Sequence, residues 1–151
     1  MTEVLFVCLH NAGRSQLAAA LLEHLAGDRF DARSAGITPA EAVNPAIAAT
    51  VAELGLDISG RVPRAVRPED LERADVVVLV KPGLPLPATP RGRVLEWAFP
   101  DPAEWTAEAV RPLRDDVATR IRSELLRGSD IAGSARIAAP VGGSERGPAV
   151  L

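Results

Sequence analysis

Runs of consecutive apolar residues alternate along the chain with segments whose apolar residues recur every three or four positions. The run from Val4 to Val7 is typical of a buried strand, whereas the spacing of Leu17, Leu21 and Leu25 predicts one face of a helix. The same patterns predict strands at residues 30–36, 75–80 and 94–97, and helices at 45–54, 68–71 and 106–126. Strands therefore alternate with helices along the chain.

The ends of these helices carry recognisable signals. Asn44 precedes Pro45, which predicts a cap followed by proline at the first helical position. Gly27 is placed as the C-terminal cap of the first helix. Pro112 lies inside the last predicted helix, so we expect either a kink or a later start there.

This alternation predicts an α/β fold, a parallel sheet with helices on both faces. We expect one domain over residues 1–126, since a chain of 151 residues buries an ordinary core. Residues 127–151 contain five glycines and little apolar periodicity, which predicts a flexible C-terminal tail. A docking strand at 136–141 is the alternative interpretation of that tail.

The loop after the first strand carries the strongest chemical signal. Cys8 ends the strand, and Arg14 and Ser15 follow six and seven positions later at the start of a helix. A strand-to-helix loop presents unpaired N–H groups and the positive end of the helix dipole, so it binds oxyanions. The same groups favour a thiolate at Cys8, and a guanidinium grips two anion oxygens at once. The expected oxyanion-binding residues are Leu9, His10, Asn11, Ala12, Gly13, Arg14 and Ser15.

Asp101 is the candidate general acid. It follows the last predicted strand, so it belongs on the same edge of the sheet as Cys8, where ligands of such sheets bind. Pro100 and Pro102 stiffen its backbone. The alternatives are structural: Asp101 as an ordinary turn residue, Cys8 as a small core residue and Arg14 as a solvated charge at a helix start.

Composition narrows the class of protein. A net charge of −3 without a basic cluster argues against nucleic acid as a partner, and no apolar run is long enough to cross a membrane. The single cysteine excludes an intramolecular disulfide and fits a reducing compartment, so we expect a cytoplasmic protein. His24 has no metal-binding partner in the sequence pattern, and we expect no metal site.

The segment from Cys8 to Gln16 resembles the active-site loop of the low-molecular-weight protein tyrosine phosphatase superfamily, most closely its arsenate reductase branch. Further similar landmarks are residues 33–36, 43–45, 53–59 and 97–102. The resemblance implies a flavodoxin-like three-layer fold with four parallel strands. It also implies Cys8 as nucleophile, Arg14 as oxyanion binder and Asp101 as general acid, with Asn11 and Ser15 as supports of the loop.

Two departures from that family bear on the substrate. Thioredoxin-recycled arsenate reductases carry two further cysteines after the third strand, and residues 80–88 contain none here. The resemblance then implies no bound cofactor but an external thiol donor: mycothiol, glutathione or a redoxin. Tyrosine phosphatases of the superfamily wall the substrate ring with aromatic residues, and here only Trp97, Phe99 and Trp105 are expected near the edge of the sheet.

We therefore expect an enzyme that forms a covalent Cys8 adduct with a tetrahedral oxyanion: arsenate, phosphate or phosphotyrosine. Arsenate reduction with an external thiol is the favoured interpretation, and phosphomonoester hydrolysis is the alternative. A third interpretation is an oxyanion-binding or regulatory protein without turnover.

Overall fold

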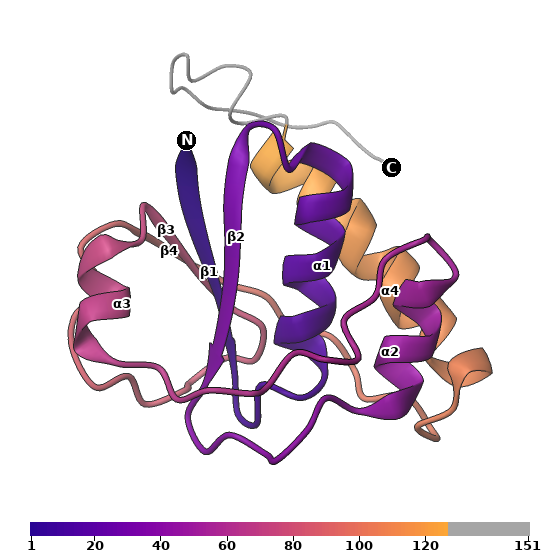
Figure 1. Cartoon of the computed structure of the whole chain (residues 1–151). Helices are drawn as coiled ribbons and strands as arrows, with labels where there is room; N and C mark the ends of the chain where they lie inside the picture. Colours follow the sequence, from indigo (N-terminus) through magenta and orange to yellow (C-terminus); the bar gives the residue numbers. More distant parts are fainter. Residues whose placement is uncertain (127–151) are drawn as a thin grey trace.

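Four parallel strands lie at the centre of the protein, whose computed structural model describes residues 1–126 (Figure 1). The tail predicted for residues 127–151, and the alternative strand at 136–141, lie outside the described residues. The strands are β1 (Thr2–Cys8), β2 (Phe30–Gly36), β3 (Val76–Leu79) and β4 (Arg93–Glu96). Their order across the sheet is β2-β1-β3-β4, and every neighbouring pair is parallel.

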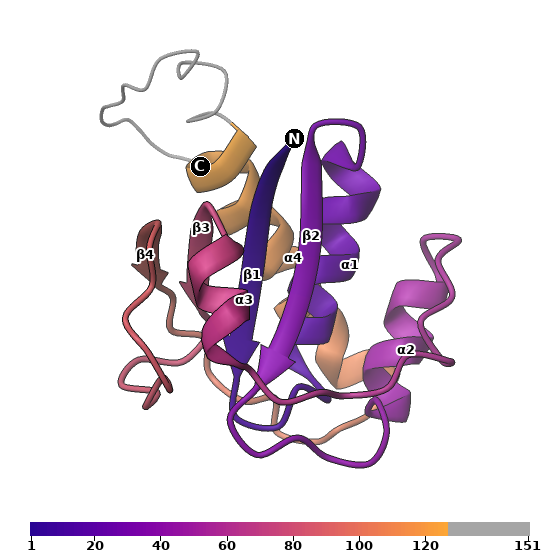
Figure 2. The ribbon, with the colours of Figure 1, turned by 60° about the vertical axis from the view of Figure 1, so that its left-hand side comes forward.

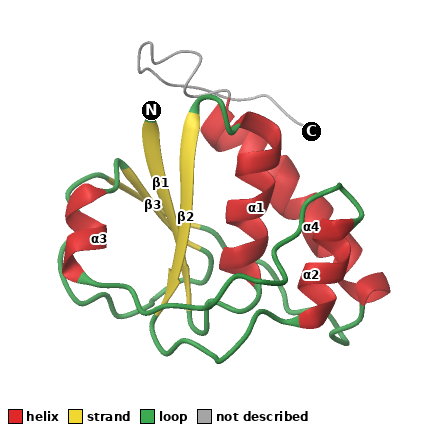
Figure 3. Cartoon of the chain, in the orientation of Figure 1, coloured by secondary structure: helices red, strands yellow, loops and turns green. Residues whose placement is uncertain are grey.

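Helices cover both faces of the sheet (Figures 2 and 3). One face carries α1 (Arg14–Ala26), α2 (Pro45–Ala52) and α4 (Ala107–Ile121), and the other carries α3 (Pro68–Arg73). The layers follow from the alternation of side chains along a strand: Phe6 packs in the α1 and α4 core, whereas Leu5 and Val7 pack on the α3 side. The predicted α/β fold with a four-stranded parallel sheet is confirmed.

All the strands and helices predicted within residues 1–126 are found, most of them with shifted ends. Asn44 caps α2 through its side chain, which accepts a hydrogen bond from the Ala46 N–H at 2.8 Å. The α-helix α4 begins at Ala107, before Pro112, so a late start is wrong. The same helix changes at Arg122 into a π-helical turn that ends at Leu126.

The Gly27 cap differs from expectation in its geometry. Its φ is −63°, a right-handed value, so it is not a left-handed cap. A Cβ at this position would lie 2.6 Å from the Glu23 carbonyl oxygen. Close approach of the backbone therefore explains the glycine.

The topology brings the candidate residues to one edge of the sheet. In a parallel sheet all strands end on the same side, and Cys8 is the last residue of β1, paired with Gly36 at the end of β2. Asp101 follows β4 by five positions, on that same edge. None of the helices within residues 1–126 is long and apolar enough to cross a bilayer.

Two arginines of α4 hold the end of α2. Arg111 contacts both carboxylate oxygens of Glu53, with its shortest distance 2.7 Å, and Arg114 donates to Glu53 at 2.8 Å and to the Thr50 carbonyl at 3.1 Å. The hydrogen bonds from Arg111 have the largest effect on the pKa of Glu53 and lower it. Burial, the next largest effect, raises this pKa, but the hydrogen bond from Arg114 and the charges of both arginines also lower it, so that the pKa falls from 4.5 to about 2. The ion pair therefore joins two helices that pack on the same face of the sheet.

This ion pair predicts an acid-dependent contribution to stability. Because the pKa of Glu53 is lower in the folded than in the unfolded chain, its contribution is present above pH 4.5 and is lost as the pH falls towards 2. We expect Glu53→Gln to destabilise the protein at pH 7, and the difference from wild type to shrink steadily between pH 4.5 and pH 2. Urea unfolding midpoints at a series of pH values measure this, with Glu72→Gln, an exposed position on α3, as control. A difference that does not change with pH would contradict it.

Candidate active site

The loop from Cys8 to Ser15, here called the anion loop, is held from outside by its carbonyl groups. The carbonyls of Cys8, Leu9, His10 and Ala12 accept hydrogen bonds from the N–H groups of Ile37, Thr38, Ala40 and Asn44, at 2.8–3.1 Å. In a trans peptide the N–H points away from the carbonyl of the same unit. The N–H groups that follow these carbonyls therefore turn towards the inside of the loop, as binding of an oxyanion requires.

The Cys8 sulfur lies inside this loop and has two hydrogen-bond partners. The Asn11 N–H donates to it at 3.2 Å, and the Ser15 hydroxyl lies 2.9 Å from it. The Asn11 side-chain amide donates to the Ser15 oxygen at 2.8 Å. Because a hydroxyl has one hydrogen and this oxygen already accepts a bond, that hydrogen is free to be donated to the sulfur. Both donors stabilise negative charge on the sulfur.

Asn11 has the one positive φ of a non-glycine residue within residues 1–126, 52°, and it is buried. Its side-chain oxygen accepts a hydrogen bond from the Arg64 N–H at 3.0 Å, and the Gln16 amide lies 3.4 Å away. Asparagine tolerates this conformation better than most residues. Gly36 passes so close that a Cβ there would lie 2.8 Å from the Asn11 nitrogen. Asn11 is thus fixed by its backbone and by its side chain.

Arg14 starts α1 and reaches across to the segment after β4. Its NH1 donates to the Phe99 carbonyl at 2.9 Å and lies 3.3 Å from an Asp101 carboxylate oxygen. The Asp101 side chain is 68% exposed, while that of Arg14 is only 17% exposed. A guanidinium has five N–H donors, so donors remain for an anion in the loop. The structure therefore brings Arg14 and Asp101 together at the edge of the sheet where Cys8 ends β1.

The three aromatic residues expected near the edge of the sheet have different positions. The prediction that Trp97 lies at the edge is wrong. Trp97 is buried in the core against Phe6, and its indole N–H donates to Glu124 at 3.1 Å. Phe99 contacts Trp97 edge to face. Trp105 does lie at the anion loop, because a Cβ on Gly13 would meet its ring at 3.6 Å, and the residue stays 44% exposed. One aromatic side chain is therefore available to a ligand.

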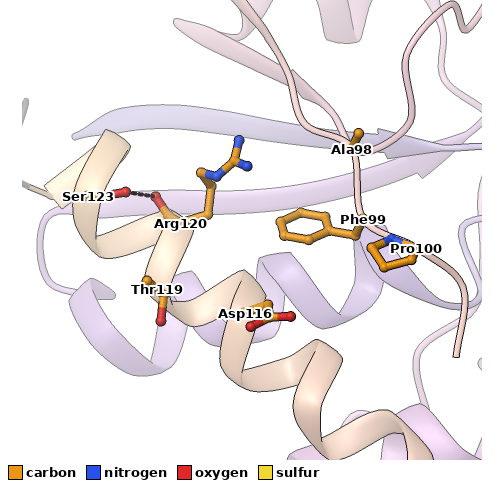
Figure 4. A pocket seen from close by; sticks show the side chains of 7 residues that line it. All are labelled: Ala98, Phe99, Pro100, Asp116, Thr119, Arg120 and Ser123. Carbon is orange, nitrogen blue, oxygen red and sulfur yellow. Dashed lines mark hydrogen bonds between the residues drawn. The ribbon is translucent and has the colours of Figure 1, made fainter. Parts of the chain in front are cut away.

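A hollow of about 340 Å³ lies between the segment that carries Phe99 and the helix α4 (Figure 4). Ala98, Phe99 and Pro100 form one wall, and Asp116, Thr119, Arg120 and Ser123 of α4 and the π-helical turn form the other. Arg120 is stacked over the Phe99 ring, 5.5 Å from its centroid, and pairs with Glu124. The hollow shares Phe99 with the site, because Arg14 donates to the Phe99 carbonyl.

His10 lies at the anion loop and contacts the segment after β2. The His10 ring nitrogen Nδ1 lies 3.1 Å from the Thr38 carbonyl, and the residue is exposed at the loop. Its ring thus ties the loop to the segment that follows β2. No group of three or more His, Cys, Asp or Glu side chains in the described part of the chain is arranged to hold a metal ion.

Sequence analysis missed several residues that build this site. The Arg64 backbone and the Phe99 carbonyl contact it through main-chain atoms, for which side-chain patterns carry no signal. Asp70 holds Arg64, and its position two residues after Pro68 indicates only a helix cap. The contact of Trp105 with Gly13 depends on how the chain returns after β4.

Comparison with known proteins gives a consistent result. A family model described as low molecular weight phosphotyrosine protein phosphatase matches residues 3–84. A protein named arsenate reductase from Halalkalibacterium halodurans is 36% identical over 129 residues, which are 80% of this chain and 92% of that protein.

Two solved structures extend the comparison. One, a Corynebacterium glutamicum thioredoxin-dependent arsenate reductase, has a TM-score of 0.75 and 32% identity over 87% of this chain. The match spans 63% of that longer chain, less than two thirds of its length. The other, a low molecular weight protein tyrosine phosphatase from T. tengcongensis, has a TM-score of 0.72 and 22% identity over 84% of this chain and 99% of its own. At that identity the likeness concerns the fold alone.

The geometry of Arg14 predicts strong anion binding. A hydrogen bond to a charged group is worth about 1.5–3 kcal/mol, so losing a two-pronged contact changes affinity by well over tenfold. We expect Arg14→Ala to weaken sulfate, phosphate or arsenate binding by at least this factor, and Arg14→Lys to lie between it and wild type, because lysine keeps the charge without the fork. Calorimetric titration measures both, with Arg91→Ala, paired with Asp75 away from the loop, as control. Equal affinities of wild type and Arg14→Ala would contradict the assignment.

Proposed function

Because the chain belongs to the low molecular weight phosphotyrosine protein phosphatase family, we propose that it is a cysteine-dependent enzyme that reduces arsenate with an external thiol. The proposal rests on the environment of the Cys8 sulfur: within the anion loop, the Asn11 N–H and the Ser15 hydroxyl face it. Cys8 is also the single cysteine of the chain. Arsenate is supported as the substrate because the relative that aligns over most of both chains is named arsenate reductase.

In the proposed first step the Cys8 thiolate attacks arsenic, and a sulfur–arsenic bond forms while an arsenic–oxygen bond breaks. The departing oxygen is a poor leaving group unless it is protonated. Asp101, at the open edge and 3.3 Å from Arg14, is the proposed proton donor. Arg14 and the inward N–H groups of residues 9–11 and 13 hold the remaining oxygens and their negative charge.

The second stage must supply two electrons to arsenic. Two thiols provide them by forming one disulfide, so that arsenate and two R–SH groups give arsenite, R–S–S–R and water. The chain has one cysteine, so at least one of the oxidised thiols comes from outside. The external thiol attacks the Cys8 adduct or its product. We propose a small thiol such as mycothiol or glutathione, or a redoxin, as this donor, with no bound cofactor.

We further propose that residues 1–126 form the complete catalytic domain, and that it works in the cytoplasm. Both strands that carry the candidate residues, and the helices that support them, belong to these residues. A reducing compartment suits the chemistry, because the nucleophile and its donor must both remain thiols.

Phosphomonoester hydrolysis is the second candidate function. The description of the matching family favours it, and so does Trp105 beside Gly13, which offers one apolar wall to an aromatic ring. In this reaction water alone completes turnover, since phosphorus gains no electrons. Oxyanion binding without turnover is the remaining alternative.

Thiol dependence separates these functions. We expect arsenite release to be zero without added thiol, to rise with the concentration of mycothiol, glutathione or a reduced redoxin, and to vanish in Cys8→Ser. Arsenite is measured directly, with p-nitrophenyl phosphate assayed in parallel and the same thiols without protein as control.

Brisk hydrolysis of the aryl phosphate with no arsenite release would replace the reductase assignment by the phosphatase one. Binding of arsenate without either reaction would instead favour an oxyanion-binding protein. Arsenite release by Cys8→Ser at the wild-type rate would remove Cys8 from the mechanism altogether.

The role of Asp101 predicts a selective loss of rate. A general acid contributes about 10²–10⁴-fold, so Asp101→Asn should slow turnover by this factor while leaving affinity for the oxyanion nearly intact. The matched control is Glu104→Gln, an exposed carboxylate three positions further along. Turnover at saturating substrate is the measurement, and an unchanged rate would make Asp101 a turn residue.

A further inference from the structure

We propose that Asp70, on α3, is a positioning residue for the Cys8 sulfur. Asp70 holds Arg64, Arg64 orients Asn11, and Asn11 in turn fixes the Ser15 hydroxyl beside the sulfur. The inference rests on the proposed function, because it takes Cys8 as the nucleophile, and it adds a residue of α3 that the reaction itself does not touch.

Asp70 is a buried carboxylate with two hydrogen-bond donors on one oxygen, and Arg73 NH2 lies 3.6 Å from the other oxygen. One of its oxygens accepts hydrogen bonds from Arg64 NH1 at 3.0 Å and from the Arg67 N–H at 2.9 Å, and its side chain is 5% exposed. Burial opposes the charge, but the hydrogen bonds from Arg64 and Arg67 outweigh it and lower the pKa of Asp70 below its ordinary 3.8. The carboxylate is therefore charged at neutral pH and anchors both ends of residues 64–67.

The segment 64–67 is held on its other side by the end of β2. The Gly36 N–H donates to the Arg64 carbonyl, and the Val66 N–H donates to the Gly36 carbonyl, both at 2.9 Å. The segment thus lies between Gly36 and Asp70. Its first N–H, that of Arg64, points at the side chain of Asn11.

This N–H decides which way the Asn11 amide is turned. The Arg64 N–H needs an acceptor, so the amide oxygen of Asn11 must face it, at 3.0 Å. The amide nitrogen then faces Ser15 and donates to its oxygen at 2.8 Å. With the amide reversed, two donors would face each other at Arg64, and a buried donor without a partner is costly.

The Ser15 hydroxyl passes this orientation on to the sulfur. Its oxygen accepts from Asn11, and an ionised Cys8 sulfur has no hydrogen to give, so the hydroxyl hydrogen points to the thiolate, 2.9 Å away. If the segment 64–67 loosens, the amide of Asn11 loses its fixed direction and the hydroxyl hydrogen is no longer held on the sulfur. Asp70 therefore influences the charge on Cys8 through four successive contacts.

Asp75 offers a matched comparison within the same molecule. Its carboxylate also accepts one backbone N–H, from Glu3 at 2.8 Å, and one guanidinium, from Arg91 at 3.0 Å. It lies before β3, at the opposite end of the sheet from Cys8. Loss of either carboxylate removes the same kind of contact, but only Asp70 is connected to the anion loop.

The single cysteine makes the test direct. Alkylation of the full-length protein by iodoacetamide reports Cys8 alone, since the chain has no other thiol, and it requires no turnover. At pH 6 we expect Asp70→Asn and Arg64→Gln each to lower the alkylation rate by roughly three- to tenfold, because a hydrogen bond to the charged sulfur is weakened. At pH 9 the rates of both variants should approach that of wild type. The double variant should lose no more than either single one.

Asp75→Asn should leave the alkylation rate at pH 6 unchanged, whatever it does to the thermal unfolding midpoint. Wild-type rates in both Asp70→Asn and Arg64→Gln would overturn the inference, as would an equal loss in Asp75→Asn, which would indicate general loosening. If Asp70→Asn does not fold, Arg64→Gln, whose side chain is partly exposed, decides the question. A shifted alkylation profile without arsenate or phosphate turnover would sink the proposed function and leave the role of Asp70 standing.

Discussion

The outward hydrogen bonds of the anion loop are the contacts on which the rest of the site depends. Four carbonyls of residues 8–12 are taken by N–H groups of residues 37–44, so the loop's own N–H groups converge on its centre. This pairing requires β2 to lie beside β1, with Cys8 level with Gly36. It also requires glycine at position 36, since a side chain there would collide with Asn11. The sheet order is therefore part of the chemistry.

The helical layer supports the same loop from a distance. Asn44 caps α2 with its side chain while its N–H bonds the Ala12 carbonyl, so the position of α2 is transmitted to the loop. The α4 arginines in turn hold the far end of α2 through Glu53. The opposite face contributes through Asp70 and the segment 64–67. Both layers that cover the sheet thus end in contacts with residues 8–15.

One thiol separates the two reactions that this kind of site supports. The roles proposed for Arg14, the inward N–H groups and Asp101 apply to any tetrahedral oxyanion, because they depend only on shape and negative charge. Arsenic differs from phosphorus in that it is reduced. Since the chain has one cysteine, the reductive half of the proposed reaction needs a thiol from another molecule.

The sequence by itself determined the strands, the order of the elements and the residues of the anion loop, because each of these features depends on residues that are close together in the sequence. Consecutive apolar residues indicate a buried strand, Asn44 before Pro45 indicates a capped helix, and Cys8 with Arg14 indicates an oxyanion loop. Only the tertiary structure decided which distant groups complete the site. Arg64 reaches Asn11 from 53 positions away, and the Phe99 carbonyl reaches Arg14 from 85. These partners are backbone atoms, which every residue possesses, so no side-chain pattern distinguishes them until the chain has folded.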